Sequence, residues 1–154
     1  MINLIGTYEC KADVKGRLLL PIALKRQLGN QINENFILKR SVFQPCLELH
    51  PYGEWKLTMD KVNKLNRFLK RNNDFIRMYT AGVRVIDFDN NGRILIPKDL
   101  LKSHFSKNNL VITTAINMIE IWDKDSYEKV INDSEIDFAD LSEKVMGNQE
   151  DDIS

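Results

Sequence analysis

The chain has 154 residues, of which 43% are hydrophobic and 29% charged, and its formal net charge is zero. This length allows one good hydrophobic core or two small ones, and a unit of about fifty residues alone would be marginally stable. No apolar run approaches a membrane span, and the first residues lack the basic start and long apolar stretch of a signal peptide. These features favour a soluble, cytoplasmic protein.

The zero net charge conceals a polarity along the chain. Residues 1–84 carry a net charge of +8, and the remaining residues therefore carry −8. A basic half is typical of a surface that meets an anionic polymer, while an acidic half can face a neighbouring subunit. A lysine-rich, solvated connector helix would explain the charge equally well.

The first part of the chain contains the turn motif Asp13-Val14-Lys15-Gly16-Arg17, followed by an apolar triplet and Pro21. A short helix is predicted from Pro21 to Leu28, because Pro is tolerated in the first turn of a helix. Apolar segments near residues 36–38 and 47–49 predict two strands. The expected order is strand, turn, strand, short helix, strand, loop and strand.

From Glu54 to about Asn72, apolar residues recur every three or four positions, with lysines on the other faces. This spacing predicts an amphipathic helix. A second helix is predicted from about Asp74 to Ala81, ending at Gly82, a residue that commonly terminates helices. The pattern leaves open whether this connector only packs on the core or also contacts a ligand.

The turn motif recurs 76 residues later as Asp89-Asn90-Asn91-Gly92-Arg93, again followed by an apolar triplet and Pro97. A short helix to Phe105 and strands near residues 109–112 and 119–121 follow in the same order. Such a recurrence indicates a tandem duplication. Because one copy alone would be marginal, we expect the two copies to share a core.

Beyond Asp133 the periodic pattern fails, since acidic residues are interrupted by few apolar ones. Phe138 is the only aromatic residue in this part of the chain. We predict a loosely ordered acidic tail over residues 133–154.

The repeated turn gives an arginine a defined position. Aspartate at the first turn position bonds backbone N–H groups two residues on, and glycine at the fourth supplies a backbone angle that other residues avoid. Arg17 and Arg93 then leave the turns at the start of a strand, where a guanidinium can hold a phosphate or read guanine in a major groove. The predicted turn-forming residues are Asp13, Gly16, Asp89 and Gly92.

The two turns differ in charge. Lys15 makes the first turn doubly cationic, whereas Asn91 occupies the corresponding place in the second. In the alternative interpretation each arginine only fastens its turn by pairing with its own aspartate, and this is more favoured for the second turn. The two roles are compatible, because an aspartate can hold an arginine in the conformation that DNA requires.

Further motifs accompany the doubled turn: Gly6-Thr7-Tyr8, Leu47-Glu48-Leu49-His50-Pro51-Tyr52-Gly53-Glu54-Trp55, Ala81-Gly82, and Asn91-Gly92-Arg93-Ile94-Leu95-Ile96-Pro97. Together, over about residues 4–132, they resemble the MraZ family of bacterial transcriptional regulators. The resemblance implies an α+β, β-rich fold in which two tandem AbrB-like swapped-hairpin units share a barrel core. The implied organisation is a first repeat over 5–53, a helical connector over 54–81, and a second repeat with a C-terminal helix over 82–132.

The resemblance also implies a function. It implies a closed ring of several subunits, associated with the nucleoid, that binds short DNA repeats ahead of the division and cell-wall gene cluster and controls that cluster. The DNA-contacting arginine of the family falls on Arg17, with Lys15 beside it, and Arg93 is its counterpart in the second turn. The expected partners are double-stranded promoter DNA and further copies of the chain, with no membrane and no small-molecule substrate.

Two other function classes remain. An AbrB-like antitoxin or an oligomeric scaffold would keep the fold and change the partner. A small-barrel enzyme would need a nucleophile or an acid–base pair, but no Ser, Cys or His recurs with the repeated turn. The isolated residues Cys10, Cys46, His50 and His104 lack metal-ligand spacing, so we expect no catalytic residue, metal or cofactor.

Overall fold

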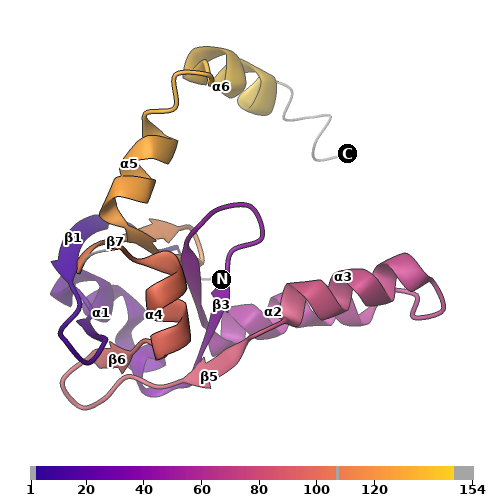
Figure 1. The fold of residues 1–154 in the computed structure, drawn as a ribbon. Coiled ribbons are helices and arrows are strands. Elements are labelled where there is room, and N and C mark those ends of the chain that lie inside the picture. The colour runs from indigo at the N-terminus through magenta and orange to yellow at the C-terminus, as the bar shows by residue number, and fades with distance from the viewer. Residues whose placement is uncertain (1–2, 107, 148–154) are drawn as a thin grey trace. The chain divides into compact units, whose positions relative to one another are not determined.

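The computed structural model describes residues 3–106 and 108–147. It divides into two units, Met1–Lys124 and Asp125–Ser154, each of which is described by itself. Helices and antiparallel strands both occur in the first unit, which confirms the predicted α+β class (Figure 1). In the described part of the chain, no helix has the length and apolarity needed to cross a membrane.

Apart from one 3-10 helix in the first half, the two halves of the first unit contain the same elements in the same order, as the duplicated sequence predicts. The first half contains β1 (Thr7–Lys11), β2 (Arg17–Leu19), α1 (Ile22–Leu28), the 3-10 helix η1 (Gly29–Asn33), β3 (Phe36–Arg40) and β4 (Leu47–Pro51). The second half contains β5 (Arg84–Ile86), β6 (Arg93–Leu95), α4 (Lys98–His104), β7 (Asn109–Ala115) and β8 (Met118–Asp123). Both short helices follow a proline, Pro21 or Pro97, which holds the backbone angle that a helix start needs.

The first strand of each repeat pairs with the other repeat. In the six-stranded antiparallel sheet the order is β1-β7-β8-β4-β3-β5, so β1 lies beside β7 and β5 lies beside β3. The repeats meet at the centre of the sheet, where β4 pairs with β8 and Glu48 lies opposite its counterpart Glu120. The strands are therefore exchanged between the two repeats.

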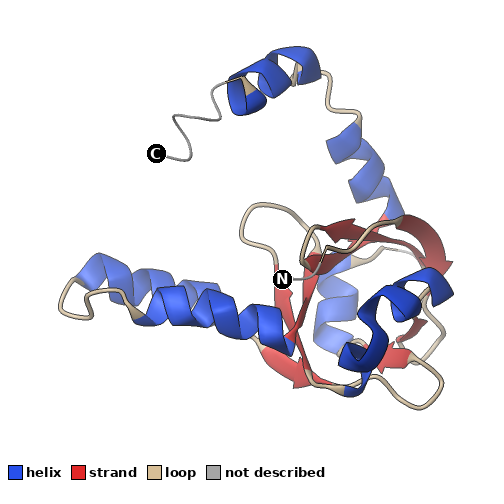
Figure 2. Ribbon diagram, turned by 180° about the vertical axis from the view of Figure 1, so that it is seen from behind, coloured by secondary structure: helices blue, strands red, loops and turns tan. Residues whose placement is uncertain are grey.

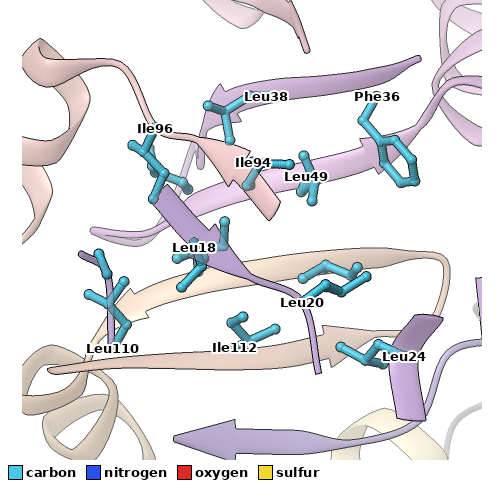
Figure 3. Packing of buried hydrophobic residues seen from close by; sticks show 14 of the residues in the cluster. Leu18, Leu20, Leu24, Phe36, Leu38, Leu49, Ile94, Ile96, Leu110 and Ile112 are labelled. Carbon is cyan, nitrogen blue, oxygen red and sulfur yellow. The ribbon is translucent and has the colours of Figure 1, made fainter. Parts of the chain in front are cut away.

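A separate two-stranded ribbon also joins the repeats. β2 pairs antiparallel with β6, and Leu18 lies opposite Ile94 at its midpoint. Both of these side chains are buried in one core with residues of the larger sheet, such as Leu49 and Ile112 (Figure 3). The repeats thus share a core, although the pairings among the described residues form an open series of strands and not a closed barrel.

The connector is a pair of helices, α2 (Tyr52–Asn63) and α3 (Lys70–Thr80), which extends away from the sheet (Figures 1 and 2). The predicted continuous helix to Asn72 is wrong, because α2 ends nine residues earlier. Asn66 accounts for the break: its Oδ1 accepts a bond from the Phe68 N–H at 3.0 Å, and its carbonyl accepts one from Asn72 Nδ2 at 2.9 Å. Asn competes for backbone bonds in this way and favours turns over helix.

Aromatic and charged contacts fasten this helix pair to the sheet. Trp55 of α2 stacks on Tyr79 of α3 with ring centroids 5.9 Å apart. The Lys39 ammonium of β3 lies 4.4 Å from the centre of the Tyr79 ring and 3.7 Å from a Glu48 carboxylate oxygen. Lys39 is 2% exposed, and its pairing with a carboxylate and an aromatic face is what makes burial of this cation tolerable.

Part of the predicted tail is helical. Helix α5 (Lys124–Ile131) begins at the last residue of the first unit and continues into the second, where α6 (Phe138–Met146) follows it along the chain. Asp137 caps α6, because its side chain accepts a bond from the Asp140 N–H at 3.3 Å. The tail thus contains one helix within the described residues, while its loose order stays a prediction, and residues 148–154 lie outside the described residues.

Candidate nucleic-acid interface

The β2–β6 ribbon has one buried face and one outward face. Leu18 and Ile94 point into the core, so the residues on either side of each point outward. The outward face carries Arg17 and Leu19 from β2 and Arg93 and Leu95 from β6. Arg17 lies opposite Leu95, and Arg93 lies opposite Leu19. The two arginines are thus diagonal neighbours, at a typical separation of about 7–8 Å.

The first turn holds its arginine with both oxygens of one carboxylate. Asp13 Oδ1 accepts bonds from the Lys15 and Arg17 backbone N–H groups, each at 2.9 Å. Asp13 Oδ2 accepts a bond from Arg17 Nε at 2.7 Å. The Gly16 N–H closes the turn on the Asp13 carbonyl at 3.0 Å. Nε makes this contact, and the two outer guanidinium nitrogens carry further N–H donors.

The second turn repeats this geometry with one looser contact. Asp89 Oδ1 accepts bonds from the Asn91 and Arg93 N–H groups, each at 2.9 Å. The Gly92 N–H bonds the Asp89 carbonyl at 3.0 Å, but Arg93 Nε lies 3.2 Å from Asp89 Oδ2. Both arginines therefore pair with their own aspartates, as the alternative interpretation of the sequence expected.

These hydrogen bonds stabilise the ionised form of each aspartate. The Arg17 backbone N–H is the main cause that lowers the pKa of Asp13, and the Arg17 guanidinium adds to it. The Arg93 backbone N–H likewise lowers the pKa of Asp89. Both carboxylates are solvent-accessible, so the effect is on turn geometry more than on the stability of the core.

Each turn is fastened to a strand end of the other repeat. The Ile96 N–H donates to the Gly16 carbonyl at 2.9 Å, and the Leu20 N–H donates to the Gly92 carbonyl at 3.0 Å. Gly16 and Gly92 have φ angles of +84° and +75°, a region that favours glycine. The position of each turn therefore depends on both repeats.

The helix that supports each turn also comes from the other repeat. A Cβ atom on Gly16 would lie 3.3 Å from Leu101 Cδ2 of α4, whereas one on Gly92 would overlap the Lys25 side chain of α1. Lys25 Nζ donates to the Asn91 carbonyl at 3.1 Å. Lys25 and Leu101 are counterparts at the 76-residue offset.

Sequence reasoning missed Lys25 as a residue of the second turn. It lies 66 positions before Asn91, and only the exchange of strands brings the two together. The signal available was the duplication itself: once the short helices are aligned by Pro21 and Pro97, a cation in one helix stands where the other has leucine.

The cysteines and the possible metal ligands were the other candidate groups in the sequence. Burial raises the pKa of Cys10 to about 11 and that of Cys46 to about 12, which keeps both thiols protonated at neutral pH. Among the described residues, no group of three or more His, Cys, Asp or Glu side chains could hold a metal ion.

Comparisons with known proteins agree on one family. The model of the family described as "MraZ protein, putative antitoxin-like" matches residues 4–78 and 80–149. A protein of Flavobacterium psychrophilum named "Transcriptional regulator MraZ" is 60% identical over 152 residues, which cover 99% of this chain and 97% of that protein.

Two further relatives carry the same name. The protein of Christiangramia forsetii is 57% identical over 150 residues, covering 97% of both chains. That of Bacteroides fragilis is 35% identical over 144 residues, covering 93% of this chain and 91% of its own length. All three are named as regulators of transcription and not as enzymes. The chain belongs to the MraZ family.

Proposed function

We propose that this protein is a sequence-specific DNA-binding regulator of transcription, which holds promoter DNA through the two Asp-x-x-Gly-Arg turns of the β2–β6 ribbon. The observation that carries the proposal is the outward face of that ribbon. It presents Arg17 and Arg93 side by side, and the carboxylates of Asp13 and Asp89 fix both. Relatives named as transcriptional regulators support the same conclusion.

A two-stranded ribbon with this outward face can enter a major groove. The groove is about 12 Å wide and admits a two-stranded ribbon, and arginine bonded to guanine is its commonest specific contact. Leu19 and Leu95 are 53% and 58% exposed on the same face, and exposed apolar side chains can contact thymine methyl groups. Lys15 is exposed at the first turn, where it can pair with a phosphate.

One chain offers few contacts for tight binding, so the proposal includes a ring of several copies. Because each chain has two similar but unequal repeats, the first repeat of one copy can meet the second repeat of the next. A head-to-tail contact of this kind closes into a ring if the rotation permits. Turns held on one ring act at high effective concentration on repeated DNA elements. By family resemblance, those elements precede the division and cell-wall gene cluster.

The test is a binding series on duplexes selected from genomic DNA. Fluorescence anisotropy is measured for one, two and three copies of the selected element at two spacings. Affinity should rise steeply with copy number, and an insertion of roughly five base pairs, half a helical turn, should reduce the gain. Equal affinity for single and repeated elements would contradict reading by a ring of turns.

Light scattering tests the assembly separately. We expect a mass several times the 17.9 kDa of one chain. A strict monomer at micromolar concentration would exclude the ring while leaving DNA binding open. A protein that assembles but selects no DNA would instead fit an antitoxin-like or scaffold role.

A further inference from the structure

The second turn lacks the lysine of the first, but it does not lack a second cation. Asn91 stands where the first turn has Lys15, yet the Lys25 ammonium reaches the Asn91 carbonyl at 3.1 Å. The second turn therefore has Arg93 from its own strand and Lys25 from α1 of the other repeat. Each turn ends up with one arginine and one lysine.

We infer that Lys25, Arg93 and the Asn91–Gly92 segment form a second phosphate-binding point, which takes a phosphodiester of the nucleic-acid backbone. The inference rests on the proposed function, since it assigns a further contact to the same interface. With this contact the two turns no longer differ in positive charge in the way that their sequences suggest. The missing charge of Asn91 is supplied from a different repeat.

The bond to the Asn91 carbonyl holds the Lys25 side chain in one position beside the second turn. Its side chain fills the space beside Gly92 that a Cβ atom would occupy, and it is only half-buried. The bond to a backbone carbonyl uses one N–H of the ammonium and leaves the others for an anion. Lysine thus fastens the turn and keeps its charge at the surface, whereas Leu101 under the first turn can only pack.

The chain supplies a matched variant. Lys25→Leu places in α1 the residue that α4 has at the same position, so it removes the charge and retains an apolar contact. The double variant Lys25→Leu/Asn91→Lys then gives the second turn the lysine pattern of the first. Arg26→Leu removes a neighbouring exposed charge from the same helix and serves as the control.

Affinity for a duplex recovered by selection from random-sequence DNA is measured by anisotropy between about 50 and 200 mM salt. Lys25→Leu should weaken binding about fivefold per engaged turn, the upper range for an exposed ion pair. It should also reduce the slope of log affinity against log salt by roughly 0.9 for each phosphate that the variant no longer neutralises. The double variant should recover both, and Arg26→Leu should change neither by as much.

The inference is overturned if Lys25→Leu keeps the wild-type slope, if Arg26→Leu lowers the slope equally, or if the double variant recovers nothing while remaining folded by circular dichroism. Arg17→Ala is measured alongside. If Arg17→Ala binds as the wild type does, the proposed use of the ribbon fails as a whole. If Arg17→Ala loses binding and Lys25→Leu does not, only the second phosphate point is wrong.

Discussion

The two Asp-x-x-Gly-Arg turns have the same backbone bonds but different support. In the first, the cation Lys15 belongs to the turn and Leu101 packs beneath Gly16. In the second, the turn has Asn91 and the cation is Lys25 of the opposite repeat. A turn and its supporting helix therefore act as one unit, even though they come from different repeats. Aligned positions of the two repeats therefore do not show that Lys25 supplies the cation of the second turn.

The largest expected effect concerns the buried midpoint of the ribbon, where the two repeats should contribute equally to the free energy of unfolding. Leu18 and Ile94 are 1% and 2% exposed, and each fills the same shared core. Leu18→Ala and Ile94→Ala should each lower the free energy of unfolding by about 2–5 kcal/mol, because each leaves a cavity. Denaturant unfolding at a fixed protein concentration measures both.

Leu19→Ala is the control for this pair, since Leu19 lies on the outward face and should change stability by less than about 0.5 kcal/mol. A large loss for only one of the two core variants would show that the repeats differ in the core as well as at the turns.

The second effect concerns the two arginines. Arg17→Ala should reduce affinity for a selected duplex by about 1–3 kcal/mol per engaged turn, the range for one good base contact. With Lys25 at the second turn, Arg93→Ala should cost a similar amount, which the turn sequences alone do not predict. Anisotropy gives the affinities and circular dichroism the folded state. A loss of stability without a loss of DNA affinity for Arg93→Ala would restrict DNA contact to the first turn.

The third effect separates the two glycines. Both Gly16→Ala and Gly92→Ala force a side chain into a backbone region that costs about 1–2 kcal/mol. At Gly16 the new Cβ would also lie 3.1 Å from the Ile96 carbonyl, which cannot move freely. At Gly92 the obstacle is the flexible Lys25 side chain, which can swing away.

Thermal unfolding should therefore show the larger loss for Gly16→Ala. The salt dependence of DNA binding should instead change for Gly92→Ala, because this substitution displaces Lys25. The reverse ranking in both measurements would mean that the surroundings of the glycines do not control the turns.

The smallest effect is a pH dependence of the turns. The pKa of Asp13 is lowered from its ordinary value of 3.8, so its ionised form stabilises the fold above about that pH. This contribution is lost as the pH falls through the lower pKa of the folded state. Asp13→Asn should thus be less stable than the wild type at neutral pH, and the difference should vanish in acid. Asp89→Asn should behave alike, because the pKa of Asp89 is lowered by the same kind of backbone bond.

Both carboxylates are accessible to solvent, so the differences in thermal midpoint will be small. Asp60→Asn, on the exposed side of α2, gives the comparison for loss of a surface carboxylate. If the Asp13→Asn difference persists at a pH well below 3.8, the ionised carboxylate is not what stabilises the turn.

The order of the elements could be predicted from sequence because the duplication allows each half to check the other. The proline before each short helix and the apolar triplets before Pro21 and Pro97 gave consistent boundaries. The sequence did not predict the break between α2 and α3, because the apolar spacing continues across it. The two bonds of Asn66 at the break, one to its side chain and one to its carbonyl, have no periodic signature in the sequence.

The turn residues of the candidate site could also be predicted from the sequence, because aspartate and glycine have specific roles in four-residue turns. Lys25 was not, because its place beside Gly92 depends on strand exchange, which no local pattern reports. DNA contact by Lys15, Arg17 and Arg93 remains a prediction.

The exchange of β1 and β5 makes each half of the chain depend on the other. Thr7 of β1 pairs with Thr113 of β7, so a half-length chain would have no internal partner for its first strand. Such a half-length chain would need a second copy of itself to close its core. In the full chain that partner is always present, and a cation that one turn lacks can come from the other half, as Lys25 does beside Asn91.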